Sequence, residues 1–117
     1  MGVIELGHVV LYVRDADASR AFYGDVLGWP VVATINVGGA RAVAFSAGRT
    51  HHELLLIEVG PDATPLPVGR RLGMYHFGIK VGDTDDELRA MLGRLADHHR
   101  DGVFIMRLLT RVEGLWP

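Results

Sequence analysis

The sequence predicts an α+β fold made of two related halves, each following the order β-α-β-β-β, with the second half incomplete. The main observation is an internal repeat, because residues 7–15 return later in the chain as residues 75–83. Both copies read His, four mostly apolar residues, Val, one spacer and Asp. A repeated supersecondary unit constrains the architecture more strongly than local propensity does.

The first copy begins a strand and leads into a helix. Residues 4–13 alternate loosely, which places His8 and Tyr12 on one face of the strand and the more apolar side chains on the other. Either Asp15 or Asp17 can accept hydrogen bonds from the first free amides of the helix that follows. The expected buried stripe of this helix consists of Ala18, Ala21, Phe22 and Leu27.

Three further strands complete the first half. Residues 29–37 and 40–47 are rich in β-forming side chains, and Gly38-Gly39 between them suits a two-residue hairpin turn. Residues 51–59 form the last predicted strand. The first half therefore reads β-α-β-β-β.

The second half repeats the first strand and helix but has little chain left for the other strands. The second histidine strand is followed by a helix that starts at Asp83 or Thr84 and runs to about residue 97. The remaining chain offers at most two strands, at 103–109 and 111–116. The second half is therefore expected to lack at least one strand.

Length and composition indicate one domain. The chain has 117 residues, of which 49% are hydrophobic and 22% charged, which suits a single modest core. We expect module one at about 3–60, a proline-containing connector at 61–72, and module two at about 73–117.

Charge and hydropathy exclude several classes of partner. A net charge of −2 provides no basic surface for nucleic acid. No apolar run approaches the roughly 20 residues needed to span a bilayer, and Glu5 interrupts the position where a signal peptide needs apolar residues. We therefore expect no membrane partner and a cytoplasmic protein. Because the chain has no cysteine, its strong metal ligands can only be His, Asp and Glu.

Several short segments carry a resemblance to a known family. They are the two histidine strands, Phe22-Tyr23 and Leu27-Gly28-Trp29. Over about residues 4–99 the chain resembles the vicinal-oxygen-chelate superfamily, which includes glyoxalase I, extradiol dioxygenases, fosfomycin-resistance enzymes and bleomycin-binding proteins. The resemblance implies paired β-α-β-β-β modules that form a metal-binding cup.

The resemblance also implies metal ligands. The first strand of each module supplies a histidine in this family, which maps onto His8 and His76, and we expect both to face one shared cavity. The third ligand is usually a glutamate near the C-terminus, for which Glu113 is the candidate, although the usual segment around it is missing here. Some members add a ligand from the last strand of the first module, where this chain offers His52 or Glu58.

The implied cofactor is a divalent metal ion, with Fe(II) favoured and Mn(II), Ni(II) or Zn(II) as alternatives. The ion would polarise a small substrate that chelates it through neighbouring oxygens, while Tyr12 and Tyr75 are candidates for donating a hydrogen bond to that substrate. The leading interpretation is a dioxygenase-like enzyme of the extradiol kind. The alternatives are a glyoxalase-like isomerase or lyase and a metal-free binding protein of the bleomycin-resistance type.

An incomplete second module leaves backbone hydrogen-bonding groups of a sheet edge unpaired, and proteins usually cover such edges. We therefore expect a homodimer or higher homo-oligomer.

Overall fold

The computed structural model describes residues 1–98. The chain divides into two compact units, Met1–Leu66 and Pro67–Pro117, and each unit is described by itself. The predicted strands at 103–109 and 111–116 lie outside the described residues.

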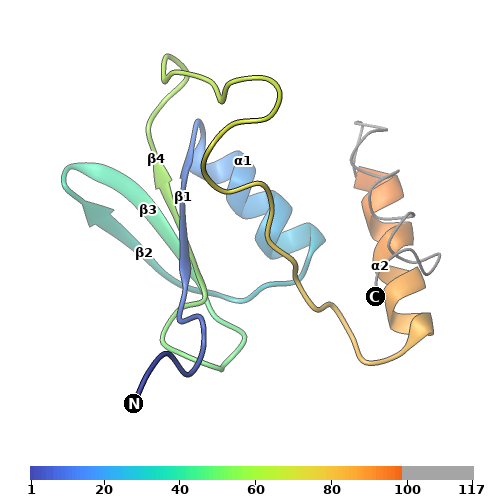
Figure 1. The fold of residues 1–117 in the computed structure, drawn as a ribbon. Coiled ribbons are helices and arrows are strands. Elements are labelled where there is room, and N and C mark those ends of the chain that lie inside the picture. Colours follow the sequence, from blue (N-terminus) through green and yellow to red (C-terminus); the bar gives the residue numbers. More distant parts are fainter. Residues whose placement is uncertain (99–117) are drawn as a thin grey trace. The chain divides into compact units, whose positions relative to one another are not determined.

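The first unit is built on a four-stranded sheet with the strand order β1-β4-β3-β2 (Figure 1). The central pair β4 and β3 is antiparallel, as is the pair β3 and β2, whereas β1 runs parallel to β4. The strands are β1 (Val9–Val13), β2 (Val31–Val37), β3 (Ala40–Phe45) and β4 (Leu54–Glu58). Together with the helical segment after β1, this order confirms the predicted β-α-β-β-β arrangement of the first half.

The first strand is shorter than predicted. β1 pairs with β4 from Val9 to Val13, in register with Leu54 to Glu58, and β4 itself is a strand of five residues. Within the described part of the chain, residues 4–8 have no neighbouring strand to complete a ladder. His8 consequently lies directly before β1 instead of within it.

The helical segment begins with α1 (Ala16–Arg20) and continues as a π-helical turn, η1 (Ala21–Val26). Asp15 is the N-cap, since its carboxylate accepts hydrogen bonds from two amides of the first turn, and the helix ends before Gly28, which has a φ of 76°. The π-helical turn widens the helix and changes which side chains face the sheet. Ala18 and Ala21 of the predicted stripe are exposed, because the first turn buries Ala16 and these two residues lie on the opposite side of the helix.

The hairpin between β2 and β3 was predicted correctly. Gly38 and Gly39 have φ angles of 59° and 87°, so both central residues of the turn adopt the positive φ that a type I′ hairpin turn requires.

One face of the sheet packs against the helix and forms the core. Figure 1 shows α1 lying along this side of the sheet. The five residues that form the core cluster are completely buried, and they come from the helix and two neighbouring strands: Ala16, Val43, Phe45, Leu54 and Leu56. Leu11 and Val13 of β1 pack against this cluster. The alternation predicted for the first strand therefore places its more apolar face on the core.

The second unit contains one described helix, α2 (Asp85–His98). Thr84 begins it, because its hydroxyl accepts a hydrogen bond from the Glu87 amide at 3.2 Å while the Glu87 carboxylate accepts one from the Thr84 amide at 3.0 Å. This reciprocal pair is a capping box. None of the helices within residues 1–98 has the length and apolar character needed to cross a membrane.

The strand predicted at residues 75–81 is not formed. This segment has neither helix nor strand structure, and the described part of the second unit, residues 67–98, contains no strand with which it could pair. An extended segment gains a strand's hydrogen bonds only from a neighbour, so the repeated sequence pattern alone was not sufficient.

Candidate histidine site

Three histidines meet at the end of the sheet where β1 and β4 begin. The rings of His8 and His52 have centroids 4.5 Å apart, those of His51 and His52 are 4.3 Å apart, and those of His8 and His51 are 6.2 Å apart. We call these three residues the histidine cluster. Because β1 and β4 are parallel and in register from their first residues, the residues that directly precede the two strands lie at the same end of the sheet.

The backbone around His8 is held by two contacts from the segment between β3 and β4. The Val9 amide donates to the Glu53 carbonyl at 2.9 Å, and the Arg49 guanidinium donates to the Gly7 carbonyl at 2.7 Å. Arg49 also forms an ion pair with Glu5 at 3.4 Å. The residues on both sides of His8 are therefore tied to the segment that carries the other two histidines.

The side chain of Glu53 organises that segment. Its carboxylate accepts hydrogen bonds from the Ala47 amide at 2.6 Å, the Ser46 hydroxyl at 2.8 Å, and the Thr50 amide and Trp29 indole, both at 3.3 Å. These donors favour the charged form, and the hydrogen bond from Ala47 contributes most to lowering the pKa of Glu53 to about 2. Glu53 is therefore ionised under all ordinary conditions.

The environment of His52 favours a neutral ring. Burial lowers its pKa below the usual value of 6.5, and the neighbouring His51 and His8 lower it further, while Glu53 acts in the opposite direction. A neutral imidazole has a free lone pair, which is the form that binds a metal ion.

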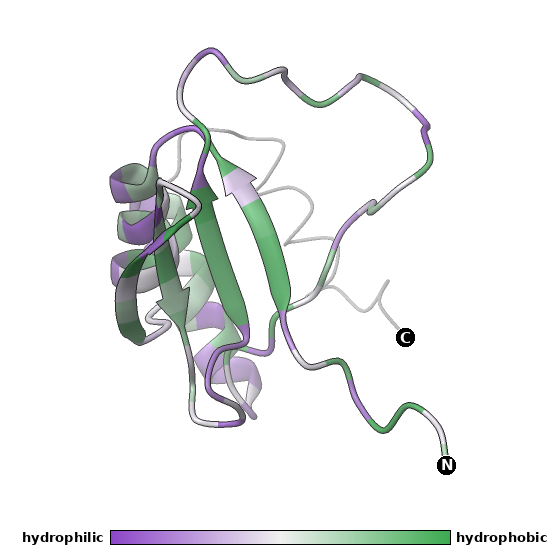
Figure 2. Cartoon of the chain, turned by 90° about the vertical axis from the view of Figure 1, so that its left-hand side faces the viewer, coloured by the Kyte–Doolittle hydropathy of each residue, from purple (hydrophilic) through white to green (hydrophobic). Residues whose placement is uncertain are grey.

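An apolar face of the sheet extends from this end of β1 and β4. Tyr12 is 76% exposed and Val10 is 44% exposed, and the register places them beside Ile57 and Leu55 of β4. Figure 2 shows that the strands of the sheet are coloured mainly as hydrophobic. The strand residues of this face opposite α1 are all uncharged: Val10, Tyr12, Ala33, Ile35, Val37, Ala40, Ala42, Ala44, Leu55 and Ile57.

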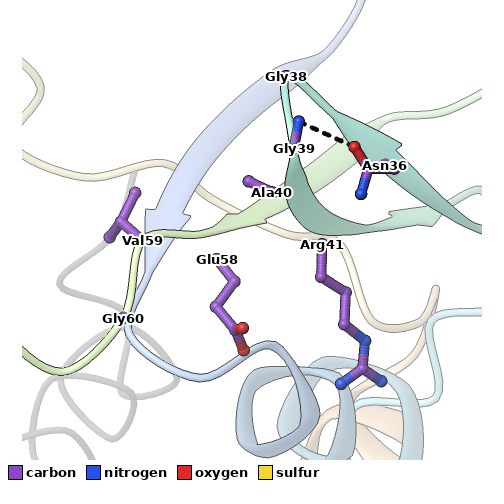
Figure 3. A pocket seen from close by; sticks show the side chains of 8 residues that line it. All are labelled: Asn36, Gly38, Gly39, Ala40, Arg41, Glu58, Val59 and Gly60. Carbon is purple, nitrogen blue, oxygen red and sulfur yellow. Dashed lines mark hydrogen bonds between the residues drawn. The ribbon is translucent and has the colours of Figure 1, made fainter.

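Glu58, the alternative ligand of the first module, lies on the other face. It is in register with Val13, which packs on the core, and its carboxylate accepts a hydrogen bond from the Ala16 amide at 2.8 Å. Figure 3 shows Glu58 and Arg41 leaving the sheet on the same side, toward the helix.

A shallow, open pocket lies beside Glu58, at the end of β4 opposite the histidine cluster. It is lined by the hairpin turn and the end of β4: Asn36, Gly38, Gly39, Ala40, Arg41, Glu58, Val59 and Gly60. Its polar groups are already engaged, since the Asn36 side chain accepts from the Gly39 amide at 2.9 Å and Arg41 is paired with Asp17. We do not assign a function to this pocket.

The remaining predicted site residues belong to the second half of the chain. Tyr75 and His76 lie in the second unit, where their ring centroids are 4.8 Å apart. Glu113 lies outside the described residues. A shared cavity for His8 and His76 therefore stays a prediction, whereas the approach of His8 and His52 is observed.

The donor atoms of the histidine cluster suit a divalent metal ion of the first transition series. Two imidazoles whose centroids are 4.5 Å apart are close enough to bind one ion, given metal–nitrogen bonds of about 2.1 Å. They do not form a complete site, because no group of three or more His, Cys, Asp or Glu side chains within residues 1–98 is arranged to hold a metal. At least one further ligand is required.

Two residues near the histidine cluster were missed by the sequence analysis, namely Arg49 and Glu53. Their side chains bind backbone groups and other side chains alike, and such contacts leave no spacing pattern in the sequence. The only available signal was the acidic residue directly after the His51-His52 pair.

Comparisons with known proteins agree with this architecture. A family model described as the Glyoxalase/Bleomycin resistance protein/Dioxygenase superfamily matches residues 5–113. Over 63 residues the chain is 43% identical to "Catechol-2,3-dioxygenase" of Bacillus subtilis (strain 168), in a match that covers 53% of the chain and 21% of that protein. The chain therefore spans well under half of the length of this relative.

A solved structure is also similar over most of the chain. The crystal structure of lactoylglutathione lyase from Agrobacterium tumefaciens matches with a TM-score of 0.56 and 29% identity, covering 86% of this chain and 74% of that one. The family model covers nearly the whole sequence, and the fold of the first unit has the β-α-β-β-β order expected from the repeat. The chain belongs to the glyoxalase/bleomycin resistance protein/dioxygenase superfamily.

Proposed function

We propose that this chain carries the metal-binding part of a dioxygenase-like enzyme that acts on a small, largely apolar substrate through two neighbouring oxygens. The metal would be held by His8 and His52 of the first unit together with His76 and Glu113 of the second half. The ion, with Fe(II) favoured, would supply Lewis-acid chemistry and two adjacent positions for the substrate oxygens.

The observation that carries this proposal is the pairing of His8 and His52 beside an uncharged sheet face. Their rings are 4.5 Å apart, and the face that extends from them offers Val10, Leu55 and Ile57 as an apolar wall. Sites for small molecules typically combine an apolar lining with a few convergent polar groups. A planar aromatic diol would place its ring against this wall and its oxygens toward the histidines.

The tyrosines are proposed to position the substrate. Tyr12 lies on the same face and is 76% exposed, so its hydroxyl can donate a hydrogen bond to a bound oxygen or exclude water from one side. Tyr75 contacts His76 through its ring and would act by orienting that imidazole.

The glyoxalase-like alternative is supported less well. It needs a carboxylate base from the first module, and Glu58 is the residue that could supply one. That carboxylate is bound to the Ala16 amide on the helix side of the sheet, away from Tyr12. The similarity of half of the chain to a protein named as a catechol-2,3-dioxygenase supports the dioxygenase-like choice.

The test is metal binding followed by turnover. Fe(II), Mn(II) and Zn(II) are titrated under anaerobic conditions into wild type and into the His8→Ala, His52→Ala and His76→Ala variants, with His98→Ala as the control because His98 is an exposed residue of α2. We expect each of the first three variants to bind metal much more weakly and the control to bind like wild type. Catechol is then supplied with oxygen to the Fe(II) form, and the absorbance of a ring-cleaved product is recorded.

Equal metal binding by all five proteins would contradict the proposal. Binding of catechol by metal-free protein without turnover would instead support a binding protein of the bleomycin-resistance type. A homo-oligomer is expected in either case.

A further inference from the structure

We propose that Glu53 is the positioning residue of the histidine cluster, because its carboxylate fixes the loop of residues 46–50 and thereby holds His51 and His52 against His8. Only the expected effect on metal affinity rests on the proposed function. The geometric part of the inference stands on the contacts of Glu53 alone.

The backbone of Glu53, which directly precedes β4, is hydrogen-bonded to the last residue of β3 and to the first residue of β1. Its amide donates to the Phe45 carbonyl at 2.9 Å, and its carbonyl accepts from the Val9 amide at 2.9 Å. The residue directly before Glu53 is His52, and the residue directly before Val9 is His8. Both histidines are thus one residue away from the same inter-strand hydrogen bond.

The carboxylate of Glu53 binds the loop of residues 46–50, which directly precedes His51 and His52. One oxygen accepts from the Ala47 amide and the other from the Thr50 amide, at 2.6 Å and 3.3 Å. Ser46, which is 8% exposed, donates to the second oxygen, and its hydroxyl accepts from the Gly48 amide at 3.0 Å. Three groups of the loop, from Ser46, Ala47 and Thr50, therefore donate to one negatively charged carboxylate.

A further hydrogen bond within this loop, from the Ser46 hydroxyl to the Thr50 carbonyl at 2.6 Å, offers no acceptor to the Ala47 and Thr50 amides. Thr50 lies directly before His51, and its hydroxyl is 3.2 Å from Nδ1 of His51, so a displacement of the Thr50 backbone moves His51 as well. Arg49 holds the opposite side of the loop to Gly7. Without the carboxylate, two backbone amides lose their acceptor, and the loop is expected to rearrange to satisfy them.

The key variant is Glu53→Gln in the full chain. Glutamine has nearly the same shape, but its amide nitrogen is a donor, so it would face either the Ala47 or the Thr50 amide with no acceptor. The matched control is Glu58→Gln, which is the same chemical change five residues further along the chain, at the end of β4, and affects a carboxylate bound to Ala16. Both variants lose one charged hydrogen-bond acceptor, yet only one of them touches the loop.

The first measurement is the nuclear Overhauser contact between the ring protons of His8 and His52. We expect it to be lost in Glu53→Gln and retained in Glu58→Gln, while the contacts between Phe45 and Leu54 in the core persist in both. Glu53→Asp keeps both acceptor oxygens and should recover part of the contact. If Glu53→Gln does not fold, Ser46→Ala removes one donor to the carboxylate together with the contacts of that hydroxyl with Thr50 and Gly48, all of which fix the same loop, and it should weaken the same ring contact.

The second measurement is affinity for Co(II) alone, a spectroscopic substitute for Fe(II). Residues that orient metal ligands typically contribute about 10- to 100-fold in affinity, and we expect a loss of that order in Glu53→Gln but not in Glu58→Gln. If wild type fails to bind Co(II), the proposed function fails while the ring contact still tests the inference. An unchanged ring contact in Glu53→Gln would overturn the inference whatever the metal data show.

Discussion

The carboxylate of Glu58 accepts a hydrogen bond from the Ala16 amide at 2.8 Å, and this contact joins the last residue of β4 to the first residue of α1. The Asp15 carboxylate accepts from the next two amides, those of Asp17 and Ala18, at 2.9 Å and 3.1 Å. Three of the four amides that a helix leaves unpaired at its start are therefore bound by carboxylates. Both negative charges also lie at the positive end of the helix dipole.

This arrangement predicts that Glu58 contributes to stability and not to metal binding. Glu58→Ala should lower the free energy of unfolding by about 1 kcal/mol, because it removes a capping acceptor, and Asp15→Ala should cost a similar amount. Urea unfolding followed by circular dichroism measures both effects. Metal titration is the second measurement, and weaker metal binding by Glu58→Ala would show that Glu58 is a candidate metal ligand after all.

The lowered pKa of Glu53 predicts a specific loss of stability in acid. Its pKa falls from 4.5 to about 2 on folding, so the unfolded chain binds the proton more readily than the folded chain does. The stabilisation from Glu53 is complete above about pH 4.5 and disappears as the pH falls toward 2. Glu53→Gln lacks this titration, so the difference in unfolding free energy between it and wild type should shrink over that interval. A constant difference from pH 6 to pH 2.5 would contradict the role assigned to the charge.

Burial and the two neighbouring imidazoles lower the pKa of His52. Acidification should therefore lower the free energy of unfolding through His52 as it does through Glu53, but at a higher pH. The unfolded chain protonates this residue below about pH 6.5, whereas the folded chain resists protonation. Acidification through this range should destabilise the protein, and His52→Gln should reduce that slope. The measurement is the urea midpoint of both proteins between pH 7.5 and pH 5.5, and identical slopes would exclude His52 as a contributor.

Two glycines with opposite backbone requirements give a paired stability prediction. Gly39 in the hairpin turn has a φ of 87°, so Gly39→Ala should cost about 1–2 kcal/mol. Gly93 lies in the middle of α2, and a side chain there would meet no atom within 4 Å. Gly93→Ala should therefore stabilise the helix by up to about 1 kcal/mol. Thermal unfolding of the two variants should shift in opposite directions.

Much of the first unit could be predicted because its signals are local. The Gly38-Gly39 pair identifies the hairpin, and an aspartate before an apolar helical stripe identifies the helix start. The residues that line the stripe were predicted less well, because the first turn of the helix buries Ala16, which leaves Ala18 and Ala21 on the exposed side. The prediction of a strand at 75–81 was wrong for a different reason. A strand forms only when another strand pairs with it, and the sequence of the segment does not show whether a partner is present.

The candidate site was predictable only in part. The repeat identified His8, and the family resemblance added His52 as one of two options. Strand alternation places His52 on the same face as Leu54, which is buried in the core. Residues 51–53 precede β4, however, so the alternation does not extend to them and His52 can approach His8. That outcome depends on the loop around Glu53, whose hydrogen bonds are mostly between one side chain and nearby loop groups and cannot be inferred from the spacing of residues.

The last prediction concerns assembly. Within Met1–Leu66 the strand β1 has β4 on one side only, and the extended segment at 75–81 has no partner strand within residues 67–98. A strand or extended segment without a neighbouring strand favours pairing with another chain. We expect a homodimer or larger homo-oligomer in which a second copy pairs with the 75–81 segment. Sedimentation velocity over a wide range of protein concentrations measures the association, because the oligomeric fraction depends on the protomer concentration.

A substitution at Gly78 separates this model from non-specific association. Gly78→Pro removes one backbone amide donor, and it should weaken the oligomer if that segment pairs as a strand between copies. Gly78→Ala is the matched control, because it keeps the donor and an added side chain there would meet no atom within 4 Å. If both variants associate like wild type, the contact lies elsewhere, for example on the exposed apolar side chains of Tyr12 and Ile35. A wild-type chain that sediments as a monomer throughout would show instead that the second half needs no neighbouring copy.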